Sequence, residues 1–146
     1  MAITSAVCTS FKQELLVGTH NFTATTGNTF KIALFTSDAT LGAGTTAYST
    51  SNEITNSSGT AYTAGGATLT SVTPTSSSTT ALCDFSDVSY TSASFTANGA
   101  LIYNDSASGD PAVCAIAFGA DKTVTSGTFT IQFPAAAATT AIIRLA

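Results

Sequence analysis

Short segments rich in β-branched and aromatic residues follow one another along the chain, each bounded by Gly, Asn, Asp, Ser or Pro. The β-branched and aromatic residues favour strands, and the bounding residues favour turns. The predicted strands are Phe30–Thr36, Ala67–Thr73, Ala81–Phe85, Ala93–Tyr103, Ala112–Phe118, Gly127–Phe133 and Ala141–Leu145. This pattern indicates an all-β fold, an antiparallel β-sandwich of the jelly-roll or immunoglobulin-like kind, with helix only at the N-terminal end.

Two of these segments also predict how deeply they are buried. In Gly127–Phe133, large apolar side chains alternate with polar ones, which is typical of a half-buried strand. The apolar set is Phe129, Ile131 and Phe133. The segment Ala112–Phe118 is apolar on both faces, so we expect it to be a central strand deep in the core.

Near the start of the chain, an apolar residue recurs every four positions, and this spacing predicts a short amphipathic helix. The apolar stripe consists of Val7, Phe11, Leu15 and Leu16. The polar residues that face away from it are Lys12, Gln13 and Glu14. Gly18 predicts the end of the helix, and Ser5 or Thr4 its N-cap.

A length of 146 residues is that of one domain. We expect an N-terminal arm with the short helix at 1–22 and a single β-sandwich domain at 23–146. Residues 37–66 are polar and Gly-rich, which predicts a long surface loop, and such loops are usually functional or ordered by a partner. Three of the loop's large apolar residues are expected to anchor it on the body, and they are Tyr48, Ile54 and Tyr62. The low-complexity stretch Thr73–Thr80 predicts a flexible turn.

Charged residues are scarce. Hydrophobic residues make up 44% of the chain and charged residues only 8%, while Ser and Thr together form about a third. Four Lys and Arg residues spread along a chain of net charge -4 form no basic patch, so we expect no nucleic-acid partner and no membrane surface as partner. The sequence has no apolar run of about 20 residues and no cation before Lys12, so it predicts neither a transmembrane helix nor a secretory signal.

The cysteines favour free thiols. Three cysteines, Cys8, Cys83 and Cys114, are an odd number, lie far apart and form no CxxC pair. A disulfide framework needs an even, closely organised set, and a zinc site needs local pairs with histidines. We therefore expect three free, mostly buried thiols, with a Cys83–Cys114 disulfide left open.

No pattern of residues predicts catalysis. The chain has a single imidazole, His20, and none of the motifs GxSxG, HExxH, GxxxxGK or GxGxxG. Just past the predicted helix end, His20 is expected to be a polar cap or a surface residue. The loose acidic groups are Asp84 with Asp87 and Asp105 with Asp110, and turn roles explain them better than a calcium site. We expect no catalytic residue, no cofactor and no metal.

The composition instead suits assembly. A β-domain with few charges presents little to desolvate when it makes flat, close contacts with other copies or with a larger surface. Short polar side chains also lose little entropy when they are immobilised. The elements whose contacts the domain itself explains least are the N-terminal segment and the loop 37–66.

Four stretches of the sequence also carry a resemblance. They are KIALFTSDATLGAGTTAYS, GTAYTAGGATL, ALCDFSDVSYTSASFTANGALIYND and AIAFGADKTVTSGTFTIQFPAAAATTAIIRL. The most telling parts are YTAGG at Tyr62–Gly66, GALIYN at Gly99–Asn104 and FGADKTVTSGTFTI at Phe118–Ile131. In these stretches, and over nearly the whole chain from Phe11, the sequence resembles small virion proteins of tailed phages that are similar to capsid cement or decoration proteins.

The resemblance implies a non-enzymatic protein of the virion, assembled in the bacterial host cytoplasm. It implies a β-sandwich that binds the outer head surface, stabilises contacts between capsomers, and has the major capsid protein as partner. We expect self-association as a dimer or trimer, and docking through the N-terminal segment or the long loop. The expected capsid contacts are Val7, Phe11, Lys12, Leu15, Tyr48 and Tyr62. For the apolar members of this set, a core role is the competing interpretation.

A tail or fibre component with a receptor- or carbohydrate-binding role is the alternative function. It would use the same fold. In that case the exposed aromatic residues of the long loop would form the binding surface.

Overall fold

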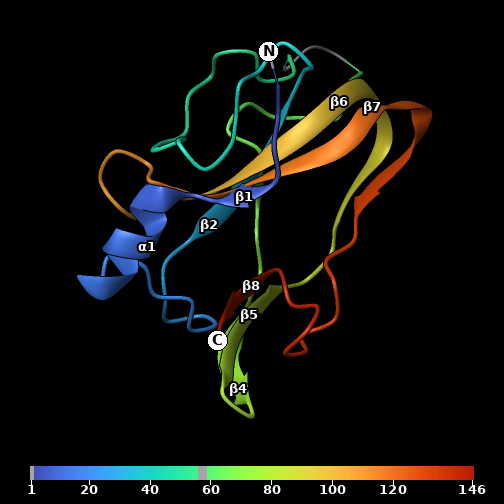
Figure 1. Cartoon of the computed structure of the whole chain (residues 1–146). Helices are drawn as coiled ribbons and strands as arrows, with labels where there is room; N and C mark the ends of the chain where they lie inside the picture. Colours follow the sequence, from blue (N-terminus) through green and yellow to red (C-terminus); the bar gives the residue numbers. More distant parts are fainter. Residues whose placement is uncertain (1, 56–58) are drawn as a thin grey trace.

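A computed structural model of the protein describes residues 2–55 and 59–146, and in them the chain forms two antiparallel sheets and one short helix (Figure 1). The elements are β1 (Ala6–Val7), α1 (Thr9–Leu16), β2 (Phe30–Phe35), β3 (Ala67–Thr68), β4 (Ser71–Ser77), β5 (Thr80–Phe85), β6 (Val88–Asn104), β7 (Ala112–Ile131) and β8 (Ile143–Leu145). The larger sheet has the order β1-β7-β6-β2-β3, and the smaller has β4-β5-β8. The sheets pack together, so the predicted all-β sandwich with a short N-terminal helix is confirmed.

The long hairpin β6–β7 dominates the fold. The sequence predicted two strands between Ala112 and Phe133, but β7 runs without interruption for 20 residues. The predicted turn residues lie inside the strand as irregularities, since Gly119 and Ser126 have positive φ angles of 81° and 46°. Such bulges bend a ribbon without ending its pairing. The hairpin therefore curves from the larger sheet towards the smaller one (Figure 1).

The stretch Thr73–Thr80 was also predicted wrongly. Instead of a flexible turn, it supplies most of β4 and the first residue of β5, which pair with each other. Thr is β-branched and fits a pleated strand even where the sequence is repetitive. The turn itself is confined to two residues, Ser78 and Thr79.

The N-terminal segment joins the larger sheet before the helix starts. The helix begins later than predicted, because β1 pairs with β7 through Ala6 and Val7. Neither Ser5 nor Thr4 caps it: the N-cap position is Cys8, and the Ser5 hydroxyl accepts a hydrogen bond from the backbone N–H of Ala117 instead. The residues 2–22 are thus part of the same body as the sandwich, through both pairing and packing.

The core lies between the two sheets and is rich in aromatic rings. Phe22 and Phe30 stack with their centroids 4.2 Å apart, and Phe85 of the smaller sheet packs 6.0 Å from Phe30. The start of β7, Ala112–Ala115, is buried as expected, and the alternation after Gly127 is also confirmed. These contacts join strands that are distant in the sequence into one core.

Candidate functional site

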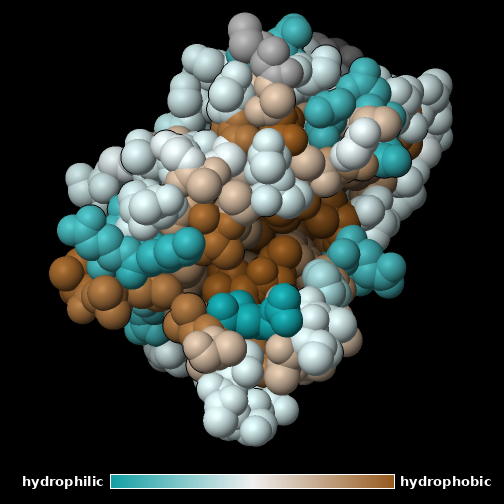
Figure 2. Space-filling view, in the orientation of Figure 1, coloured by the Kyte–Doolittle hydropathy of each residue, from teal (hydrophilic) through white to brown (hydrophobic). Residues whose placement is uncertain are grey.

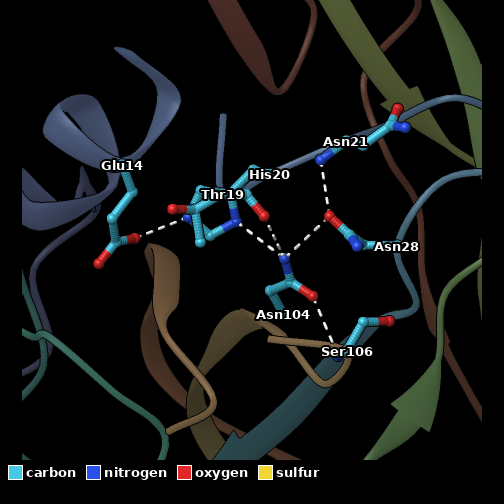
Figure 3. A network of polar contacts seen from close by, with 7 residues as sticks. All are labelled: Glu14, Thr19, His20, Asn21, Asn28, Asn104 and Ser106. Carbon is cyan, nitrogen blue, oxygen red and sulfur yellow. Dashed lines mark hydrogen bonds and ion pairs between the residues drawn. The ribbon is translucent and has the colours of Figure 1, made fainter. Parts of the chain in front are cut away.

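A buried polar network links the N-terminal segment to β6 (Figure 3). The Nε2 atom of His20 lies 2.6 Å from Oε2 of Glu14, and its Nδ1 lies 3.1 Å from Nδ2 of Asn104. An amide nitrogen can only donate, so Nδ1 accepts and Nε2 carries the proton that it donates to Glu14. The arrangement assigns the tautomer of His20.

Asn104 is the centre of this network, and its side chain is fully buried. Its amide nitrogen also contacts the Asn28 side-chain oxygen at 3.2 Å and the Thr19 carbonyl at 3.4 Å. Its oxygen accepts a hydrogen bond of 3.0 Å from the backbone N–H of Ser106. Every polar atom of this amide therefore has a partner, which is the condition for burying it at low cost.

The same geometry excludes His20 as a catalytic base in this conformation. Its side chain is 0% exposed, and both ring nitrogens are already engaged. A general base needs a free nitrogen within hydrogen-bond reach of the proton that it abstracts. The prediction of a polar cap or surface residue at His20 is wrong. The residue instead fastens the segment after α1 to the larger sheet.

A second polar cluster orders the loop 37–66. One oxygen of the half-buried Glu53 accepts hydrogen bonds from the Tyr62 hydroxyl at 2.6 Å and the Gly65 backbone N–H at 2.7 Å. Its other oxygen accepts one from the Tyr48 hydroxyl at 2.6 Å. Burial and the Glu53 carboxylate raise the pKa of both tyrosines above the ordinary value, so both remain donors.

The loop anchors that the sequence predicted are confirmed. Tyr62 and Ile54 are buried, and Tyr48 stacks on Tyr103 with ring centroids 4.4 Å apart. Close approach of the backbone at Gly66 fixes the end of the loop: φ is +82°, and an added Cβ would lie 2.0 Å from the carbonyl oxygen of Ile32. The described residues of the loop are thus held in the middle and at the C-terminal end of the loop.

The acidic residues near the turns mostly contact backbone and basic groups. Asp87 accepts a hydrogen bond from the Phe133 backbone N–H at 2.8 Å, and Asp105 pairs with Lys31 at 3.3 Å. Within residues 2–55 and 59–146, no three His, Cys, Asp or Glu side chains gather closely enough to hold a metal ion.

All three cysteines are free thiols, so Cys83 and Cys114 are not joined. Cys8 and Cys114 are buried, and Cys83 is half-buried. Burial raises the pKa of Cys114 to about 12 and that of Cys8 and Cys83 to about 11. Since the thiolate is the reactive form, these thiols are poor nucleophiles at neutral pH.

The six residues predicted to contact a capsid do not form one surface. Phe11 and Tyr62 are 1% and 2% exposed and belong to the core. The half-buried members pack against that core, and they are Val7, Leu15 and Tyr48. Only Lys12 is exposed.

The exposed end of α1 was not predicted from the sequence. Leu16, the last residue of the helix, is 89% exposed, and the next residue, Val17, is 73% exposed. We call these two residues the helix tip. The signal was present in the sequence, because Leu15 and Leu16 are adjacent and a narrow helical stripe cannot bury both.

An apolar groove lies on β7, and we call it the β7 groove. It has a volume of about 490 Å³. Its apolar wall consists of Ile116, Phe118, Phe129, Ile131, Phe133 and Ile142. Figure 2 shows a hollow lined by hydrophobic surface in the middle of this face, with more hydrophobic surface at the end of α1.

The groove exists because β7 bends. Ile116 and Phe118 precede the irregularity at Gly119, whereas Phe129 and Ile131 follow the one at Ser126. The two apolar stretches consequently face a common space, and Ile142 closes it from the segment before β8. A concave apolar surface of this kind is typical of a binding site for another molecule.

Comparison with known proteins adds no family to these observations: no family model, no curated protein and no solved structure matches the chain. None of the described helices is long and apolar enough to cross a membrane. The class that the structure defines is a two-sheet antiparallel β-protein with a long loop and an apolar groove.

Proposed function

We propose that the protein is a non-enzymatic structural protein of a phage virion, a cement or decoration protein that binds the outer surface of the head and stabilises contacts between capsomers. The major capsid protein is its partner, and copies associate with one another as a dimer or trimer. The observation that carries the proposal is the long loop: its described residues, 37–55 and 59–66, contain no regular helix or strand, yet Glu53 holds three of them by hydrogen bonds.

An ordered loop is suited to docking. Ordering a flexible loop on binding costs free energy, and a loop that is already held by the hydrogen bonds of Tyr48 and Tyr62 to Glu53 avoids most of this cost. Its outward-facing residues are short and polar, and Thr50, Ser51 and Asn52 are exposed. Such side chains are cheap to immobilise, which suits a contact repeated by symmetry over a shell.

The carbohydrate-binding alternative needs aromatic rings that face solvent on this loop. Tyr62 is buried, Tyr48 lies against Tyr103, and the chain has no Trp. No aromatic platform is thus offered by the described residues of the loop. Location on a tail remains an outcome that the experiment distinguishes.

The test is to mix the purified protein with phage particles that lack it and to image them by electron cryomicroscopy. Density repeated over the icosahedral lattice is expected. Density confined to the tail would overturn the capsid proposal in favour of a tail or fibre component. Particles without added density would also overturn the proposal.

A pair of variants tests the docking surface. Thr50→Arg places a long charged side chain on the loop and should reduce particle binding at least tenfold. Ser76→Arg makes the same change on exposed β4, at the opposite end of the molecule (Figure 1), and should leave binding unchanged. Equal binding by both variants would show that the loop does not dock.

A further inference from the structure

We propose that the helix tip of one copy inserts into the β7 groove of a second copy, so that the chain associates head to tail. This inference deepens the self-association proposed above by assigning the two surfaces that meet. It requires no capsid, and it can be tested on the purified protein alone.

The helix tip is a protruding apolar surface. Leu16 and Val17 are 89% and 73% exposed. The carbonyls of Glu14 and Leu15 are occupied by the N–H groups of Thr19 and Gly18, and this tight turn holds the tip away from the body. Two adjacent large aliphatic side chains in water are a costly surface to maintain, and covering them is favourable.

The β7 groove has the size and chemistry to receive this tip. A side-chain carbon needs roughly the volume of a water molecule, about 30 Å³. The seven side-chain carbons of Leu16 and Val17 therefore need about 210 Å³, and the groove offers about 490 Å³. Ile116, Phe118 and Ile142 on its wall are only half-buried, so the contact would cover apolar surface on both copies.

Charge complementarity favours the same pairing. Lys122 lines the groove and forms no ion pair within the described residues. The last turn of α1 contains no basic residue, so the partial negative charge of the helix C-terminus is not compensated there. The carbonyls of Leu16 and Val17 accept no backbone hydrogen bond from the described residues, and a tip seated in the groove would bring them towards the Lys122 ammonium group.

The proposed contact is heterologous, because it joins two different surfaces of the chain. The tip lies at the end of α1 and the groove in the middle of the face (Figure 2), so each contact uses the tip of one copy and the groove of the other. A pair joined by one such contact leaves one tip and one groove free, so that further copies extend the chain or close it into a ring. Two side chains bury far less than the 1,200 Å² or so of a stable interface, so the contact is weak in solution and gains strength on a lattice.

Sedimentation equilibrium of the full chain, from about 10 μM to about 1 mM, provides the test. The wild-type mass should rise with concentration. Leu16→Glu should raise the dissociation constant at least tenfold, as expected for the loss of one buried aliphatic contact. The matched control Val72→Glu changes another exposed apolar residue, outside both surfaces, and should associate like the wild type.

A mixture of a tip variant and a groove variant distinguishes the contact of tip with groove from a contact between two identical surfaces. Leu16→Glu keeps its groove, and Ile142→Asp keeps its tip, so each variant alone should remain monomeric. Their equimolar mixture should form dimers that grow no further. Circular dichroism verifies that Ile142→Asp folds; if it does not, the exposed Lys122→Glu takes its place with a smaller expected loss.

Three results would overturn the inference. They are a wild type that stays monomeric up to 1 mM, a Leu16→Glu variant that associates normally, and a mixture of two folded monomeric variants that forms no dimer. None of these results concerns particle binding, which the Thr50→Arg comparison measures. The self-contact and the capsid contact can therefore fail separately.

Discussion

The two halves of the β6–β7 hairpin are built from the same two strands but have different surroundings. The near half, residues 99–104 paired with 112–117, is flanked by β1 and β2 in the larger sheet. The far half, residues 88–97 paired with 122–131, pairs with neither of them. Leu101 and Ile102 in the near half are completely buried, whereas Ile131 in the far half is half-buried.

The comparison shows that the flanking strands go with burial of both faces of β6 in the near half, whereas the far half buries only one side of β6. The near half is covered by its neighbours and carries few polar side chains. The far half alternates Thr with apolar residues and uses its apolar side as the wall of the β7 groove. Stability should therefore depend mainly on the near half, and binding on the far half.

The largest expected effect is a cavity in the near half. Leu101→Ala should lower the free energy of unfolding by about 2–5 kcal/mol, because the surroundings of a completely buried side chain cannot fully collapse. The matched change Ile131→Ala in the far half should cost about 1 kcal/mol, since that side chain is already partly hydrated. Urea titration of both variants measures the difference, and equal losses would break the comparison.

The buried network gives the next largest effect. Asn104→Ala leaves His20 Nδ1 and the Ser106 N–H without their partner and should cost about 1–3 kcal/mol. Asn98→Ala removes an amide between the two halves, at the bulge of the hairpin, whose nitrogen donates to exposed Asp121, and should cost less than about 0.5 kcal/mol.

Hydrogen exchange sharpens this second prediction. Asn104→Ala should speed exchange in residues 19–30, which the network holds against β6, while exchange in Asn98→Ala should match the wild type. Unchanged exchange in residues 19–30 would mean that the aromatic packing of Phe22 and Phe30 holds this segment without the network.

Much of the fold could be predicted from local sequence, because strand residues and turn residues alternate clearly. The error at β7 has a specific cause: Gly119 and Ser126 are turn formers, but here they are absorbed as bulges in a strand whose partner β6 continues alongside. Whether such a residue turns or bulges depends on the partner strand, and a single strand's sequence does not contain that information.

The candidate site was less predictable. The roles of His20 and Asn104 depend on a contact between residues 84 positions apart, and the β7 groove needs the bend of β7 and the position of Ile142. Phe11 and Leu16 were assigned to one stripe, yet one is core and the other is exposed. Periodicity identifies an apolar side of a helix, but only the packing partner decides how much of that side is covered.

Rising alkaline pH should lower the stability of the protein first through Cys114 in the near half and then through Tyr90 in the far half. Burial raises the pKa of Cys114 from 9.0 to about 12 and that of Tyr90 from 10.0 to about 12. Each of these groups loses its proton at a lower pH in the unfolded chain than in the folded protein. Its contribution to the free energy of unfolding is therefore complete below the unfolded pKa and is lost as the pH rises through the folded pKa. In thermal melts, the stability of Cys114→Ala should fall less steeply with pH than that of the wild type. The difference should begin near pH 9 and reach about 1 kcal/mol at pH 10. Tyr90→Phe should reduce the loss of stability only above pH 10. An effect of Tyr90→Phe at lower pH than that of Cys114→Ala would contradict this prediction.

The smallest expected effect lies on the exposed side of the far half. The hydroxyls of Thr96 and Thr123 are 2.8 Å apart across the two strands, and both side chains are exposed. Water can replace either partner, so Thr123→Ala should change the free energy of unfolding by no more than about 0.5 kcal/mol in urea titration. A loss above about 1 kcal/mol would show that cross-strand hydroxyl pairs stabilise the far half as strongly as partial burial does. Pairing between β6 and β7 would then be enough to hold the far half in place, and the β7 groove would keep its shape before a second copy binds.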